Sequence, residues 1–249
     1  MYCGYIGSHI LVSLRDPVTS SQTNIQYSVV VVDNLANSSR ESLRRVADIS
    51  SLDGGFSMEK DGSGGQDPNG RLIFRKVDCC DAPALRAVFE EFASKGGFDA
   101  VVHFAGLKAV GESKLTTLRY YEVNIGATWT LLSLMEEYGC RSIVFSSSAT
   151  VYGVAKDEKA NLKETDEVGV TITNPYGRTK YMIEQILGDF HGSHALLREQ
   201  GKDVKDWSVA ILRYFNPAGA HPSGKMKEDP NGVPNNLRNH AIICQSNFR

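Results

Sequence analysis

A tyrosine and a lysine four residues apart, with a serine-rich segment ahead of them, form a group that could move a proton. Tyr176 and Lys180 follow Asn174 and Pro175, which are typical of an N-cap and a first helical position, so both side chains are expected on one helix face. A lysine ammonium about 4 Å from a phenol, at an effective dielectric near 20, favours the phenolate by roughly 4 kcal/mol, or about three pKa units. Tyr176 could then take a proton from an alcohol or sugar hydroxyl, which Ser148 could orient.

The same spacing also occurs on ordinary helix faces, and a Tyr–Lys pair by itself favours that simpler interpretation. The position of the serines adds information. Ser146, Ser147 and Ser148 follow the apolar run 142–145, so they are expected where a buried strand ends. The choice between the two interpretations therefore depends on the rest of the chain.

Apolar runs and amphipathic segments alternate along the chain, which is typical of strands buried on both faces and the helices that cover them. We expect strands at 29–32, 72–77, 98–104, 142–145 and 207–213. We expect helices at 4–14, 38–52, 81–94 and 116–138 and from Asn174 onward. Residues 53–70 are rich in glycine and show no periodicity, which indicates a flexible surface loop. The alternation predicts an α/β fold with an open parallel sheet and helices on both faces.

Composition excludes several classes of protein. The 249 residues, 41% of them hydrophobic and 22% charged, indicate a soluble globular protein with one large core or two smaller lobes. A formal net charge of -2 gives no reason to expect nucleic acid or a membrane as a partner. No apolar run could span a bilayer, and the N-terminus lacks the pattern of a signal peptide. Five cysteines, an odd number without metal-ligand spacing, indicate reduced thiols, no bound metal and a cytoplasmic location.

The first helix and the first strand carry a pattern that could bind a dinucleotide. Gly4 and Gly7 stand at the start of the helix, where glycines let the backbone approach a pyrophosphate and the helix N-terminus offers free N–H groups. Two such glycines are more often a simple turn. Asp33, at the end of the next strand, could hold the ribose hydroxyls and would repel a 2′-phosphate, which favours NAD over NADP. Asp78 could meet the adenine edge, or equally serve as a strand-end cap.

The strand expected at 98–104 leads into a second candidate segment. Lys108 follows its carboxyl end, where ligands bind in open α/β sheets, and could meet a phosphate or the nicotinamide ribose. His103 precedes that edge, which favours a packed strand residue over a catalytic base. Asn124 is a poor helix former inside a long helix and could bond backbone or water near a cofactor.

Six ordered segments resemble the UDP-glucose 4-epimerase family of the extended short-chain dehydrogenases/reductases. They are residues 4–9, 32–35, 103–113, 145–153, 174–180 and 212–224, and the similarity extends along the chain to about Leu237. The resemblance implies a Rossmann-like doubly wound sheet and interconversion of UDP-glucose and UDP-galactose through a 4-keto intermediate, with NAD taking a hydride from C4 and returning it to the other face. It assigns the proton transfer to Ser148 and Tyr176, and it gives Lys180 the lowering of the tyrosine pKa and a bond to the nicotinamide ribose.

The resemblance also implies the remaining binding residues. NAD is expected to contact Gly4, Tyr5, Ile6, Gly7, Asp33, Asn34, Asn37, Ser38, Asp78, Phe104, Ala105, Gly106, Lys108, Asn124, Tyr176, Lys180 and Phe215. The UDP-sugar is expected to contact Lys108, Ser148, Ala149, Thr150, Tyr176, Asn216, Asn236 and Leu237. Residues 1–215 would form the NAD-binding domain and residues 216–249 the start of an incomplete substrate-binding lobe. The complete family member is expected to be a homodimer.

Two departures from the family pattern bear on activity. Met1 stands where the family has the first glycine of its turn and no strand precedes it, so the first central strand is expected to be missing. The tail from Arg238 onward does not follow the family either. We therefore expect a chain truncated at both ends that is not an efficient epimerase, with a catalytically silent isoform or partial gene product as the alternative. A sugar-nucleotide dehydratase is disfavoured, because Ser148-Ala149-Thr150 offers no acid/base carboxylates.

Overall fold

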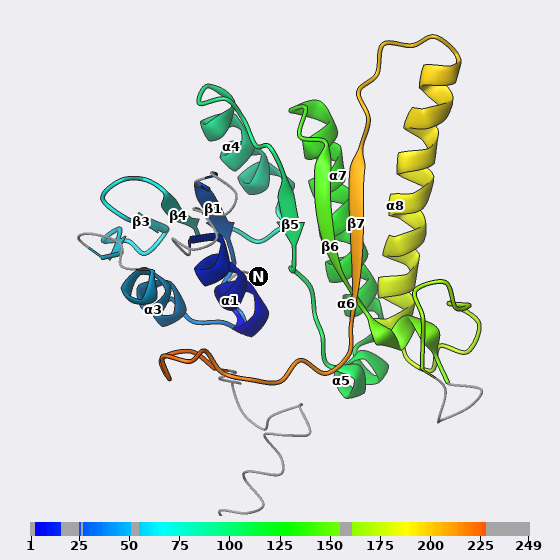
Figure 1. Ribbon diagram of the computed structural model, residues 1–249, viewed down its shortest axis with the longest axis horizontal. Helices are drawn as coiled ribbons and strands as arrows, with labels where there is room; N and C mark the ends of the chain where they lie inside the picture. The colour runs from blue at the N-terminus through cyan, green and yellow to red at the C-terminus, as the bar shows by residue number, and fades with distance from the viewer. Residues whose placement is uncertain (1–2, 16–24, 26, 51–54, 155–160, 228–249) are drawn as a thin grey trace, which may run out of the picture. The chain divides into compact units, whose positions relative to one another are not determined.

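The computed structural model describes residues 3–15, 25, 27–50, 55–154 and 161–227 (Figure 1). Its contacts divide the chain into two compact units, which we describe separately. Unit 1 comprises residues 1–78 and 216–249, and unit 2 comprises residues 79–215. Strands and helices alternate in both, so the predicted α/β class is confirmed. No helix among the described residues has both the length and the apolar character needed to cross a membrane.

Unit 1 is built around a four-stranded sheet in the order β1-β4-β3-β2. β1 (Val29–Val32) pairs in parallel with β4 (Leu72–Arg75), with Val29 opposite Leu72. Helices α1 (Tyr5–Arg15) and α3 (Glu41–Ile49) supply the other half of the core. The core is a cluster of buried apolar side chains from all four elements, among them Leu11, Val31, Leu43, Val46 and Phe74.

The prediction of a flexible loop at 53–70 was wrong for its described part, residues 55–70. β2 (Ser57–Met58) and β3 (Gly64–Gln66) lie there and pair antiparallel, and β3 pairs antiparallel with β4. A Cβ atom on Gly65 would lie 2.7 Å from the carbonyl oxygen of Ser57, so this glycine permits close strand packing. The buried carboxylate of Asp67 accepts a hydrogen bond from the Leu72 amide at 2.6 Å and so fixes the turn.

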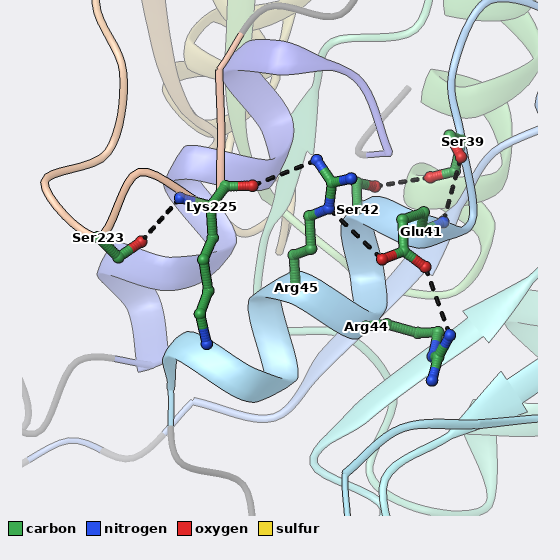
Figure 2. A network of polar contacts seen from close by, with 7 residues as sticks. All are labelled: Ser39, Glu41, Ser42, Arg44, Arg45, Ser223 and Lys225. Atoms are coloured by element: carbon green, nitrogen blue, oxygen red, sulfur yellow. Dashed lines mark hydrogen bonds and ion pairs between the residues drawn. The ribbon is translucent and has the colours of Figure 1, made fainter.

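Residues 216–227 belong to unit 1 and are held there by α1 and α3. The Tyr5 hydroxyl donates to the Gly219 carbonyl at 3.0 Å, and Met226 is buried in the core. Figure 2 shows the contact with α3, where the Arg45 guanidinium lies between the Glu41 carboxylate and the Lys225 carbonyl, which accepts at 3.2 Å. The expected boundary between Phe215 and Asn216 coincides with a boundary between units, while the substrate-binding lobe itself stays a prediction.

Unit 2 is built around a three-stranded parallel sheet in the order β5-β6-β7. Its strands are β5 (Val101–His103), β6 (Ser142–Ser148) and β7 (Ser208–Tyr214). The helices are α4 (Ala82–Ala93), α5 (Val110–Leu115), α6 (Thr117–Tyr121), α7 (Ala127–Glu137) and α8 (Pro175–Glu199). α8, the longest of the described helices, packs on β6 and β7 and runs alongside β7 in Figure 1.

Two predicted elements of unit 2 differ from the observed ones. The single helix expected at 116–138 is interrupted by a π-helical turn, η1 (Glu122–Gly126), between α6 and α7. Asn124 lies in this turn, where its amide bonds to backbone outside the helix. The strand that was expected to end at Phe145 continues through Ser148, because Ser146, Ser147 and Ser148 still pair with Leu212, Arg213 and Tyr214 of β7.

The described strands form two sheets, one in each unit, where one doubly wound sheet was predicted. Unit 1 also contains antiparallel pairs, whereas the prediction was of parallel strands. Within the described residues α1 is the first element. The expected loss of a central strand ahead of it stays a prediction.

Candidate active site

The carboxyl end of β6 and the first turn of α8 bring the predicted proton-transfer residues together in unit 2. The Asn174 side chain accepts a hydrogen bond from the Gly177 amide at 2.8 Å, and Pro175 occupies the first turn, so the predicted start of the helix is confirmed. Ser148 ends β6 and caps the 3-10 turn η2 (Ala149–Tyr152) by accepting from the Thr150 amide at 3.2 Å. The predicted substrate residues Ala149 and Thr150 therefore lie on this turn, next to Ser148.

Tyr176, Lys180 and Ser148 lie within a few ångströms of one another. The Lys180 Nζ atom is 5.9 Å from the centroid of the Tyr176 ring and 4.7 Å from that of Phe145. It donates to the Ser146 carbonyl at 2.6 Å, and the residue is only 5% exposed. The Ser148 hydroxyl is near enough to the Tyr176 phenol to act on its pKa. The phenol, the ammonium and the serine hydroxyl thus share one site.

The pKa of the Tyr176 phenol is raised, whereas the sequence predicted a lowered value. Burial raises it and outweighs the hydrogen bond with Ser148, which lowers it. The Lys180 ammonium donates its hydrogen bond to the Ser146 carbonyl, so in this geometry burial decides the direction of the Tyr176 shift. Burial also lowers the pKa of Lys180 to about 8, against the opposing charge of Glu184. The phenol is therefore neutral at pH 7 in the protein alone.

Asn124 fixes the segment that follows β5. The residue is 1% exposed, and its side-chain oxygen accepts from the Leu107 amide at 2.7 Å. Its amide group donates to the Leu107 carbonyl at 3.1 Å and to the Thr179 hydroxyl at 3.0 Å. Thr179 in turn donates to the carbonyl of Tyr176 at 2.7 Å. The predicted bonding of Asn124 to backbone is confirmed, and it links the 104–108 segment to the catalytic helix.

Replacing Asn124 by alanine is expected to destabilise unit 2 by several kcal/mol. The substitution removes three hydrogen bonds and leaves the partly buried N–H and C=O groups of Leu107 without these partners, at a cost of up to about 1–3 kcal/mol each. Urea unfolding measures the loss. Ser113→Ala is the matched control, because it removes one buried hydroxyl whose bond to the Val110 carbonyl is local to α5. A loss of stability no greater than that of the control would contradict the linking role of Asn124.

His103 is a packed strand residue, as predicted. It is buried, and its Nε2 atom lies 2.9 Å from the Thr128 hydroxyl oxygen. Because that hydroxyl donates its proton to the Asn124 carbonyl, the Nε2–H group of a neutral imidazole is the donor. Burial lowers the pKa of His103 to about 3, so the ring stays neutral at physiological pH. Of the other predicted residues of unit 2, Phe104 contacts the ring of Tyr214, while Lys108 and Phe215 are exposed.

The residues of unit 1 that were predicted to hold NAD gather at the start of α1 and after β1. The Gly4 carbonyl accepts from the Ser8 amide at 3.0 Å, and Gly7 is buried within the first turn. That turn has no acidic side chain, so the helix N-terminus keeps its affinity for an anion.

Asp33 is 1% exposed and already accepts three hydrogen bonds. They come from the Cys3 amide at 3.0 Å, the Leu35 amide at 2.8 Å and the Ser38 hydroxyl at 2.9 Å. An ionised carboxylate has about four lone-pair sites, which leaves one for a ribose hydroxyl.

Two further predicted cofactor residues meet beside Asp33. The Asn34 side chain donates to the Asp78 carboxylate at 2.8 Å, whereas Asn37 is exposed. Asn216 is exposed as well, and Asn236 and Leu237 lie outside the described residues.

The residues present fit NAD within each unit separately. In unit 1 they are a helix N-terminus without acidic neighbours and a carboxylate with spare acceptor capacity. In unit 2, Gly106 has φ +151°, and a Cβ there would lie 3.0 Å from the Asn124 side-chain oxygen. The segment around Gly106 thus has room only for glycine, as expected where backbone borders a ligand.

Sequence reasoning missed a buried ion pair beside the site. Glu184 accepts two hydrogen bonds from Arg213, at 3.2 and 2.9 Å, and one from the hydroxyl of Ser147. The available signal was that Glu184 stands four residues after Lys180 and so shares its helix face. Arg213 could not be paired with it from sequence, because the partners lie 29 residues apart on different elements.

The chain is similar to proteins of one family along nearly its whole length. Residues 3–242 match the model of the NAD dependent epimerase/dehydratase family. "UDP-glucose 4-epimerase 2" of Arabidopsis thaliana is 47% identical over 234 residues, which cover 94% of this chain and 55% of that protein. The UDP-glucose 4-epimerase of Bacillus subtilis is 46% identical over 234 residues, which cover 94% of this chain and 56% of that protein.

A solved structure shows the same likeness. The crystal structure of UDP-glucose 4-epimerase from Bifidobacterium longum, in complex with NAD+ and UDP, gives a TM-score of 0.73 at 37% identity. The match covers 94% of this chain and 57% of the other. This chain therefore spans little more than half the length of each of these relatives.

Proposed function

Because this chain belongs to the NAD dependent epimerase/dehydratase family, we propose that its site serves a UDP-glucose 4-epimerase, which interconverts UDP-glucose and UDP-galactose with NAD. The observation that carries the proposal is the shared site of Ser148, Tyr176 and Lys180 in unit 2. A phenol beside a serine hydroxyl, with a buried ammonium nearby, can exchange a proton with a sugar hydroxyl. The Arabidopsis thaliana and Bacillus subtilis relatives, both named UDP-glucose 4-epimerases, support the proposal.

Each side chain has a distinct role in this proposal. Tyr176 takes the proton from O4 of the sugar and later returns it, and Ser148, which lies beside the phenol, orients that hydroxyl. Bound NAD would supply the acceptor and donor of the C4 hydride. Burial alone makes Tyr176 a poor base, so Lys180 and the positive charge of an oxidised nicotinamide must together favour the phenolate.

The proposed contacts with NAD fall into two separate sets, one for each unit. In unit 1 these are the Gly4–Gly7 turn, Asp33 with its neighbours Asn34, Asn37 and Ser38, and Asp78. In unit 2 they are the segment 104–108, Asn124 through its hold on that segment, Tyr176, Lys180 and Phe215. Substrate contacts by Lys108, Asn216, Asn236 and Leu237 belong to the same proposal.

Oligomeric state, location and the rest of the fold are proposed with the activity. Large apolar side chains are exposed on neighbouring helices of unit 2, with Leu115 85%, Leu118 84% and Trp129 66% exposed, which supports a homodimer. The thiols of Cys3 and Cys140, which form no disulfide among the described residues, support a cytoplasmic protein. We also propose that the complete fold is a single doubly wound sheet with a further central strand ahead of α1 and a substrate-binding lobe.

The cofactor choice gives a prediction of its own. The protein is expected to bind NAD at least about ten-fold more tightly than NADP, since the Asp33 carboxylate would repel a 2′-phosphate. Calorimetric titration measures both affinities. Asp33→Asn should reduce the preference for NAD over NADP. Asp61→Asn, a change of the same kind at an exposed turn, should leave that preference unchanged. Equal affinities of the unaltered protein for the two nucleotides would contradict the role of Asp33.

The proposed function is tested by assaying interconversion of the two UDP-sugars in both directions. Because the chain spans little more than half of its relatives, two proteins are compared. One is the chain itself, and the other, the extended chain, also carries the segments of the Bacillus subtilis relative that lie outside the matched region. Turnover by the extended chain supports the proposal. A folded extended chain that binds NAD but gives no product would overturn it.

A further inference from the structure

Four elements of unit 2 meet at a buried group of charged side chains next to the candidate active site. Glu184 on α8 is buried and accepts from Arg213 on β7 through two nitrogens, at 3.2 and 2.9 Å. Two parallel bonds of this kind fix both the distance and the plane of the two groups. The same carboxylate accepts from the Ser147 hydroxyl on β6. One carboxylate thus joins a helix to two neighbouring strands.

Arg213 extends the network to the turn that carries Ser148. Its guanidinium donates to the Tyr152 hydroxyl at 3.1 Å and lies 5.0 Å from the centroid of that ring. It also donates to the Glu164 carbonyl at 3.0 Å, and the Tyr152 hydroxyl donates to the Lys163 carbonyl at 3.1 Å. The turn η2 and the segment that follows it are therefore tied to the same ion pair.

The network surrounds the residues that would do the chemistry. Ser147, which it holds, lies between Ser146, whose carbonyl accepts from Lys180, and Ser148, which contacts Tyr176. Glu184 stands one turn after Lys180 on the same face of α8. A change in the position or charge of Glu184 would therefore reach both the serine and the lysine.

We propose that Glu184 and Arg213 are positioning residues, whose buried ion pair locks the end of β6 against α8 and sets the electrostatic environment of Lys180. The role in catalysis rests on the proposed function, whereas the effect on Lys180 is a property of the protein alone. An isolated buried charge is costly, so a carboxylate kept here needs Arg213 as its partner. Glu184 is the member of the pair on the same helix face as Lys180, so its negative charge acts on the ammonium.

Several ionisable groups lie on the elements that pack against α8 or beside it in the sheet. They are Glu112 on α5, Tyr120 on α6, Tyr152 on η2, His103 on β5, and Arg213 and Tyr214 on β7, besides Tyr176 and Glu184 on α8 itself. The His103 imidazole is neutral, and the Tyr120 hydroxyl is bonded to the Glu112 carboxylate. Among these groups, Glu184 carries the negative charge that favours the protonated form of Lys180.

The test is an NMR titration of the full chain with lysine isotopically labelled at the ε-carbon, the Lys180 signal being assigned with Lys180→Met. In Glu184→Gln, the pKa of Lys180 should fall by about one unit or more, because the nearby negative charge is gone. In Arg213→Gln it should rise, because Lys180 is then the cation on the same helix face that must offset the buried Glu184 carboxylate. Arg213→Lys should restore most of the original value by keeping a cation in place.

Glu137→Gln is the matched control, because Glu137 also binds an arginine, Arg86, through both of its carboxylate oxygens, but at the surface. It should leave the pKa of Lys180 unchanged. A merely structural pair would give shifts of the same sign in Glu184→Gln and Arg213→Gln, or none, and either result overturns the proposal. If Glu184→Gln fails to fold, the Arg213→Gln titration decides alone. A rise in the pKa of Lys180 supports the proposal, and a fall or no change overturns it.

A second measurement tests the catalytic part. In the extended chain, Glu184→Gln should lower kcat at least about ten-fold with little change in KM, because Ser148 and Lys180 are displaced while the substrate contacts remain. A raised KM with unchanged kcat would contradict positioning. The titration requires neither cofactor nor substrate, so it stands or falls independently of the proposed function.

Discussion

Tyr176→Phe is expected to reduce UDP-sugar interconversion by the extended chain by about two to four orders of magnitude, the contribution usual for general acid–base catalysis. The substitution removes only the phenol oxygen, which lies near Ser148 and would receive the O4 proton. The ring keeps its packing beside Lys180, so stability should hardly change. Initial rates at saturating substrate, with a thermal melt of each protein, measure both effects.

The matched control is Tyr181→Phe on the same helix. The ring of Tyr181 packs closely on Gly169, where a Cβ would lie 2.4 Å from it, and its hydroxyl has no role in the proposal. This control should keep nearly full activity. If Tyr176→Phe also kept its activity with an intact fold, another group would have to be the base.

Lys180→Met is expected to change both the pH dependence of the rate and that of stability. The pKa of Lys180 is lowered to about 8 in the folded protein, against about 10.4 for an unperturbed lysine. Between these values the unfolded chain binds more protons, so this residue makes stability rise with pH. From pH 7 to pH 9 its contribution should grow by roughly 1 kcal/mol, and the methionine variant should lack that rise.

The pH dependence of the rate should change as well. Without the ammonium the phenolate is harder to form, so the basic limb of the pH–rate profile of Lys180→Met should move to higher pH. Lys95→Met is the control, because the Lys95 ammonium also lies over an aromatic ring, 4.6 Å from the centroid of Phe92, but is exposed. An unchanged profile in Lys180→Met would remove the lysine from the account of the tyrosine pKa.

Local signals in the sequence were sufficient for the helix that carries the site. Asn174 and Pro175 mark its start by capping and by a fixed φ, both of which depend on neighbouring residues alone. The i, i+4 rule then places Tyr176 and Lys180 on one face, as observed. The packed role of His103 was also predictable, because a histidine before the strand end faces the interior of an α/β sheet.

The errors arose where contacts between different segments decide the structure. Glycines at 64 and 65 were read as flexibility, although they allow close packing of β3 against the neighbouring strands β2 and β4. The ammonium of Lys180 was expected to favour the Tyr176 phenolate, but its hydrogen bond is accepted by the carbonyl of Ser146, 34 residues away. Spacing along one helix fixes which residues share a face, and it does not fix which partner each atom chooses.

The most direct test of the central claim follows the hydrogen at C4 of the sugar. UDP-glucose carrying deuterium at C4 is incubated with the extended chain and NAD, and the UDP-galactose formed is analysed by mass spectrometry. If Tyr176 moves only the O4 proton while the C4 hydrogen leaves and returns as a hydride, the product should keep the deuterium. Product that has exchanged its C4 deuterium with water would show that the carbon itself is deprotonated, and the role proposed for Ser148, Tyr176 and Lys180 would be contradicted.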